Sequence, residues 1–166
     1  SIRIVSGDYV VTMDSQCQVL REAGLALEAD RIVAVASREQ LQQDFPQASH
    51  EHLAGCALMP GLVNCHTHVP MALFRGIADD KELMDWLNNY IFPIESKTLS
   101  PDFVRCGTRL AFWEMLRGGT TCVVDMYMFE NVVAEVAAEV GMRGIFSQAI
   151  QPNPEVFAFK YGFFKK

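Results

Sequence analysis

MPGLVNCHTH, at residues 59–68, places two histidines two positions apart, directly after a Pro-Gly turn and a short apolar run. In a β-strand, side chains at alternate positions project from the same face. His66 and His68 are therefore expected to project together from the end of a strand. Two imidazoles placed in this way can bind one metal ion, so we expect both histidines to be metal ligands.

The same spacing occurs a second time in the chain, at His50-Glu51-His52. This pair has neither the Pro-Gly turn nor the strand-end setting, so we interpret it as part of a solvated strand. The surrounding context, more than the spacing, decides how a short motif is interpreted.

The composition is typical of a soluble globular protein, with 166 residues of which 50% are hydrophobic and 20% charged. A net charge of −6 argues against binding to nucleic acid or to an anionic membrane surface. No apolar run approaches the ~20 residues of a membrane span, and the first residues lack the apolar segment of a signal peptide. Five cysteines without C-x-x-C spacing favour reduced thiols in a cytoplasmic protein over a disulfide framework.

Residues 1–56 are expected to form a small sheet of short strands. A turn at Ser6-Gly7-Asp8 should separate the first two strands, and Ala29-Asp30-Arg31 is typical of a hairpin connection. A short helix is expected from Arg38 to Asp44, and Pro46 is expected to stop it.

Residues 57–150 alternate between strands and helices. The segments predicted are a buried strand at 62–63, a helix at 83–91 ending near Pro93, a helix at 101–117, a strand at 120–125, a helix at 129–140 and a strand at 143–149. This alternation implies a parallel sheet with helical crossovers, in which ligands bind beyond the carboxyl ends of the strands. The histidine pair and Asp125-Met126 both follow such strand ends.

Four segments of the chain resemble the amidohydrolase superfamily, most closely its branch of methylthioadenosine/S-adenosylhomocysteine deaminases and triazine hydrolases. They are PGLVNCHTHVPMALFRGIADD (60–80), MDWLNNYIFPIE (84–95), EMLRGGTTCVVDMY (114–127) and GMRG (141–144). The resemblance implies an α/β fold in which residues 57–150 form the first units of a (β/α)8 (TIM) barrel. Residues 1–56 would belong to a small β-sandwich, and residues 151–166 form an atypical tail.

The resemblance also implies roles for individual residues. His66 and His68 would hold one Zn²⁺ (or Fe²⁺) per site, Glu95 would hold the ribose hydroxyls of a nucleoside, and Trp86 would wall the substrate pocket. The remaining ligands and the proton-transferring glutamate of the family come from later strands, and no histidine follows His68 in this chain. The catalytic residues are therefore unknown within it and are expected beyond its end.

The function implied is hydrolytic deamination of an adenosine-type nucleoside such as S-adenosylhomocysteine or methylthioadenosine, with this chain as an N-terminal fragment that is inactive alone. Two alternatives stay open at this point. One is another reaction of the superfamily, that of a triazine hydrolase or of a guanine or cytosine deaminase, and the other is a non-catalytic remnant or interaction module. The expected partners are a small-molecule substrate and further copies of the chain, because a partial barrel leaves sheet edges open.

Several of these residues also have a structural explanation. Asp125 is as well explained by a hydrogen bond to a neighbouring loop as by chemistry. Glu95 could cap a local turn, and Trp86 could belong to a helix core. Glu114 is expected to pair with Arg117, three positions further along the same helix.

Overall fold

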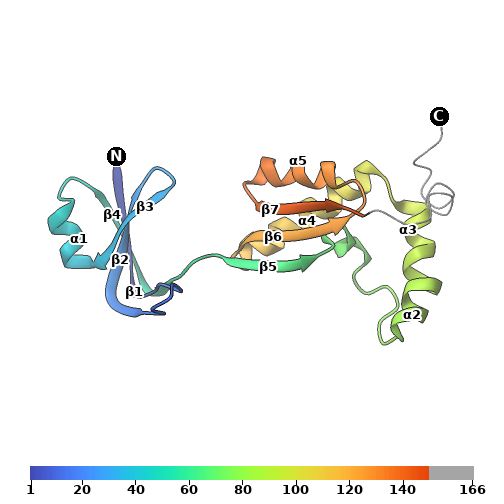
Figure 1. Ribbon diagram of the computed structural model, residues 1–166, viewed down its shortest axis with the longest axis horizontal. Helices are drawn as coiled ribbons and strands as arrows, with labels where there is room; N and C mark the ends of the chain where they lie inside the picture. The colour runs from blue at the N-terminus through green and yellow to red at the C-terminus, as the bar shows by residue number, and fades with distance from the viewer. Residues whose placement is uncertain (150–166) are drawn as a thin grey trace. The chain divides into compact units, whose positions relative to one another are not determined.

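The computed structural model describes residues 1–149 and divides the chain into two compact units, residues 1–60 and the part that begins at Gly61. Figure 1 shows the elements of each unit. The tail predicted at residues 151–166 lies outside the described residues. None of the helices between residues 1 and 149 is both long and apolar enough to cross a membrane.

The first unit is a four-stranded sheet with one helix. Its strands are β1 (Ile2–Val11), β2 (Val19–Glu28), β3 (Arg31–Ser37) and β4 (Ser49–Leu58), in the order β3-β2-β1-β4. Helix α1 (Arg38–Asp44) buries Leu41 against Ile4 and Ala26 of the sheet. The predicted hairpin and short helix are confirmed. The β-sandwich stays a prediction, because the described residues form one sheet here.

The predicted turn at Ser6-Gly7-Asp8 is wrong, because β1 continues through these residues, with a shift of its register against β4 between Gly7 and Tyr9. Gly7 pairs with Leu53 of β4, and a Cβ added to it would lie 2.8 Å from the carbonyl oxygen of Cys56. The glycine therefore permits a close approach between two strands, which is the other common reason for glycine within a strand.

The second unit contains a parallel sheet, as predicted. Its strands are β5 (Leu62–Thr67), β6 (Thr120–Tyr127) and β7 (Arg143–Gln148), in the order β5-β6-β7. Helices α4 (Pro101–Arg117) and α5 (Glu130–Val140) pack together and against this sheet (Figure 1). The core between them contains the fully buried side chains of Val104, Phe112, Val123, Val133 and Val136.

Capping residues set the bounds of these helices. The hydroxyl of Ser100 accepts a hydrogen bond from the Phe103 N–H at 3.1 Å, which starts α4 where the sequence predicts it. Gly141 ends α5 with a left-handed φ of 75°.

Leu62 and Val63, predicted to be buried, are 49% and 57% exposed, because β5 is an edge strand that pairs only with β6 in the described part of the chain. Barrel closure therefore stays a prediction.

A helical segment runs from residue 83 to residue 98 and passes through the predicted stop at Pro93. It consists of α2 (Leu83–Trp86), a π-helical turn (Leu87–Ile91) and α3 (Phe92–Thr98), after a 3₁₀ helix at Val69–Phe74. The Phe92 N–H bonds the carbonyl of Leu87, five positions back. Pro93 then occupies the first turn of α3, where its missing N–H costs little. The helix thereby extends to include Glu95.

Candidate metal and substrate site

The two histidines of the opening motif come together at the carboxyl end of β5. The ring centroids of His66 and His68 are 5.1 Å apart, and their planes meet edge to face at 76°. The side chain of Asn64 accepts a hydrogen bond from the His66 backbone N–H at 3.2 Å, which steadies the chain just before the pair. The juxtaposition expected from the spacing is therefore observed.

A backbone carbonyl sets the tautomer of the neutral His68 ring. Its Nδ1 atom lies 2.5 Å from the carbonyl oxygen of Met126 on β6. Because a carbonyl only accepts, Nδ1 carries a proton, and in the neutral ring Nε2 then keeps its lone pair, as in most metal-binding histidines. Within residues 1–149, neither this Nε2 atom nor either ring nitrogen of His66 has a hydrogen-bond partner.

The lone pairs of these histidines fit a metal such as zinc, but the set of ligands is incomplete. No group of three or more His, Cys, Asp and Glu side chains in the described part of the chain could hold a metal ion. Catalytic zinc sites use three protein ligands and one water. The chain therefore offers two imidazoles of a site that needs at least one further ligand.

Asp125, near the end of β6, holds the residues on both sides of His68. It is fully buried, and its Oδ1 atom accepts hydrogen bonds from the Val69 N–H at 2.9 Å and from the hydroxyl of Thr67. The structural alternative for Asp125, a bond to a neighbouring loop, is therefore what the molecule uses.

A second acid, which the sequence did not single out, lies beside Asp125. Glu130 begins α5 and is only 4% exposed. Burial, and then the negative charge of Asp125, raise the pKa of Glu130 to about 8. Its place in the first turn of an amphipathic helix suggests an exposed acid favoured by the helix dipole, so the local sequence carries no sign of its burial.

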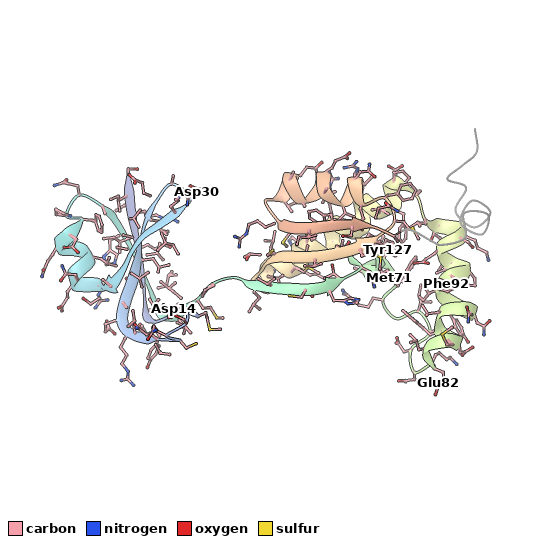
Figure 2. The ribbon with its side chains drawn as sticks, in the orientation of Figure 1. Asp14, Asp30, Met71, Glu82, Phe92 and Tyr127 are labelled. Carbon is pink, nitrogen blue, oxygen red and sulfur yellow. The ribbon has the colours of Figure 1, made fainter. Side chains whose placement is uncertain are left out.

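One cavity of about 330 Å³ brings together His68, Trp86 and Glu95, three of the four residues that the sequence selected. Other residues that line it include Met71, Phe92 and Tyr127. In Figure 2, Tyr127 lies at the end of β6, Met71 lies on the 3₁₀ helix that follows β5, and Phe92 lies on the helical segment. Glu95 is 5% exposed and accepts a hydrogen bond from the hydroxyl of Tyr127. Tyr127 was not foreseen, although its place just past Asp125 at a strand end was a usable signal.

A smaller cavity of about 260 Å³ adjoins the same histidines. It is lined by both imidazoles together with Arg75 and Glu114. Arg75 donates two hydrogen bonds to the Glu114 carboxylate, at 2.9 and 2.6 Å, and lowers the pKa of that group. The ion pair predicted within α4 is therefore replaced by this longer-range one, while Arg117 lies over the ring of Trp113 at 5.2 Å.

Comparisons with known proteins agree with this geometry. The sequence model of the amidohydrolase family matches residues 57–156. The chain is 43% identical over 151 residues to the 5-methylthioadenosine/S-adenosylhomocysteine deaminase of Syntrophobacter fumaroxidans, covering 91% of this chain and 34% of that protein. It is 44% identical over 148 residues to the 5'-deoxyadenosine deaminase of Methanopyrus kandleri, covering 88% of this chain and 33% of that protein.

A solved structure also resembles most of the chain. The adenosine deaminase of Xanthomonas campestris with bound zinc has a TM-score of 0.75 and 38% identity, over 86% of this chain and 33% of that one. The chain thus spans about a third of the length of the curated relatives that it matches.

Proposed function

The chain belongs to the amidohydrolase family, and on this premise we propose that it contributes to the active site of a metal-dependent deaminase of adenosine-type nucleosides. The proposed substrates are S-adenosylhomocysteine, methylthioadenosine and close analogues. The observation that carries the proposal is the single cavity lined by His68, Trp86 and Glu95, with the ring of His66 5.1 Å from that of His68. A metal ligand and a buried carboxylate in one cavity suit a substrate that has both a reactive ring and hydroxyl groups.

Each residue has a specific role in this proposal. His66 and His68 hold a divalent ion such as zinc, which when bound makes water a strong nucleophile at neutral pH. Met126, through its carbonyl, keeps the Nε2 atom of His68 available as a ligand. Glu95 accepts hydrogen bonds from the ribose hydroxyls and is itself oriented by Tyr127. Trp86 forms an apolar wall of the cavity.

The proposal is tested in a complete enzyme that contains this sequence. Residues 1–149 replace the matching part of the Syntrophobacter fumaroxidans relative, and ammonia release from S-adenosylhomocysteine is measured. We expect turnover by the chimera and its loss after His66→Ala, because the ion would then lose a ligand. A folded, zinc-loaded chimera without turnover on any adenosine-type nucleoside would refute the proposal.

The isolated chain is expected to bind metal weakly and to release no ammonia. Two imidazoles rarely retain zinc, since catalytic sites use three protein ligands. The same assay on the purified 166-residue chain checks this expectation. Robust turnover by the isolated chain would show that it is wrong.

Glu95 discriminates between nucleosides and ribose-free substrates of the same family, such as guanine or triazines. In the chimera, Glu95→Gln should raise KM for a nucleoside by about tenfold, because hydrogen bonds to a charged group contribute about 1.5–3 kcal/mol. An unchanged KM would instead favour a substrate that lacks the sugar.

A non-catalytic role is the alternative that the sequence leaves open. Zinc analysis of the chimera after dialysis separates the candidates, with its His66→Ala variant as the control. Zinc that stays with the chimera and leaves the variant supports a working metal site that includes His66. Equal and negligible zinc in both proteins would support a remnant or interaction module.

A further inference from the structure

Buried carboxyl groups behind the histidine pair remain unexplained by the ligand roles proposed above. Asp125 and Glu130 are 0% and 4% exposed. The Oδ2 atom of Asp125 and both carboxyl oxygens of Glu130 are buried without a hydrogen-bond partner among the described residues. Buried polar atoms are nearly always paired, so three such atoms in one place require an explanation.

A proton between the two acids supplies that explanation. Two carboxylates only accept, so they cannot bond to one another and would repel. A protonated Glu130 can donate its O–H to the Oδ2 atom of Asp125, which pairs two of the three oxygens, one on each residue. The raised pKa of Glu130, about 8, agrees with a protonated group at neutral pH.

The other oxygen of Asp125, Oδ1, connects the two acids to the segment that contains His68. Oδ1 accepts from the residues immediately before and after His68, namely the Thr67 hydroxyl and the Val69 N–H. The next residue of β6, Met126, receives the Nδ1–H of His68 through its carbonyl. Consecutive residues of one strand therefore hold the ring of His68 and the two residues that flank it.

We propose that Asp125 and Glu130 share one proton and act as positioning residues, which hold the segment around His68 so that its Nε2 atom stays available to a ligand. This inference rests on the proposed function for its metal-binding consequence. The position of the ring itself does not depend on metal and can be measured separately.

The test uses the whole chain labelled with ¹⁵N-histidine, without metal, and compares Asp125→Ala with Val123→Ala. Val123 lies on the same strand and is fully buried, so its truncation lowers stability without removing a bond to the His68 segment. We expect Asp125→Ala to shift or broaden the ¹⁵N resonances of His68 and to lose its slowly exchanging Nδ1–H signal. Val123→Ala should keep both features. Equal spectra for the two variants would overturn the inference.

Zinc titration of the same proteins provides the second measurement. Removing a group that orients a metal ligand typically weakens metal binding 10- to 100-fold. We expect a loss of at least tenfold for Asp125→Ala and little loss for Val123→Ala. If the parent chain binds no zinc while the His68 signals still change in Asp125→Ala, the positioning role stands and the proposed metal site fails. If the parent binds zinc and the signals do not change, the metal site stands and the positioning role fails.

Two conservative variants keep the inference testable if Asp125→Ala does not fold. Asp125→Asn retains the oxygen that accepts from Thr67 and Val69, and Glu130→Gln retains a donor toward Asp125. Both should preserve the Nδ1–H signal of His68. Thr67→Val removes one donor of the same network and should weaken that signal. Loss of the signal in both conservative variants, or its full retention in Thr67→Val, would contradict the proposal.

Discussion

The two His-x-His pairs have the same spacing and opposite surroundings. On β4, the hydroxyl of the buried Ser6 bonds the Nε2 atom of His50 at 2.9 Å and the Nδ1 atom of His52 at 3.0 Å. The remaining nitrogens face Gln42 at 2.8 Å and Arg38 at 3.4 Å. At the end of β5, the carbonyl of Met126 is the only hydrogen-bond partner of the ring nitrogens of His66 and His68 among residues 1–149.

This difference shows what distinguishes a structural pair from a candidate metal site. Both members of the first pair are exposed, as predicted, yet all four of their ring nitrogens contact protein atoms. A metal ion needs unprotonated nitrogens with free lone pairs. The second pair has them, because its support comes through the backbone and leaves most of the ring nitrogens open.

Metal retention should give the largest difference between the pairs. We expect His66→Ala to weaken zinc binding by about 100-fold, since losing a ligand should cost at least as much as losing a group that orients it. His50→Ala should leave zinc binding unchanged. Calorimetric titration of both variants measures this, and similar losses would erase the distinction drawn between the pairs.

The buried support of each pair predicts a difference in pH dependence, because Ser6 is neutral and the Asp125–Glu130 pair carries charge. The pKa of Glu130 is raised from 4.5 to about 8 in the folded chain. Between these values the unfolded chain loses a proton that the folded chain keeps, so the stability of the second unit falls as pH rises.

Glu130→Gln should remove this dependence and raise the free energy of unfolding by about 2 kcal/mol near pH 6. Urea denaturation followed by tryptophan fluorescence reports it, because both tryptophans, Trp86 and Trp113, lie in the second unit. A parent chain whose stability does not fall relative to the variant between pH 5 and pH 8 would contradict the protonated state of Glu130.

Removing the hydroxyl of Ser6 tests the structural pair. Ser6→Ala should lower the free energy of unfolding of the first unit by about 1.5 kcal/mol, because two imidazoles lose a hydrogen-bond partner. Amide hydrogen exchange in β1 and β4 measures the effect. Zinc binding serves as the control and should not change. A loss of zinc with unchanged exchange would reverse the roles of the two pairs.

The smallest effect is expected in the cavity beside the second pair. Tyr127→Phe removes the hydroxyl that bonds Glu95 and should lower the stability of the second unit by about 1 kcal/mol. Tyr9→Phe, at an exposed position in the first unit, is the control. If urea denaturation gives the same free energy of unfolding for both variants, the hydroxyl of Tyr127 does not stabilise this cavity.

Much of the local structure follows from the sequence. Ser100 and Gly141 mark helix ends by their capping chemistry, and the strand–helix alternation predicts the parallel sheet. The predictions that fail do so for tertiary reasons. Ser6-Gly7-Asp8 resembles a turn, but Gly7 instead permits close strand packing. Pro93 resembles a helix stop but follows a π-helical turn.

The features of the candidate site were likewise predictable from the sequence only in part. The sequence by itself determined that two imidazoles leave β5 together, because alternation along a strand is a local property. Only the tertiary structure decided which ring nitrogens are open, since Met126 lies 58 positions from His68 and Asp125 lies 56 positions from Val69. Burial of Glu130 likewise depends on how α5 packs against the sheet. Contacts between distant segments depend on strand register and helix packing, which no local pattern encodes.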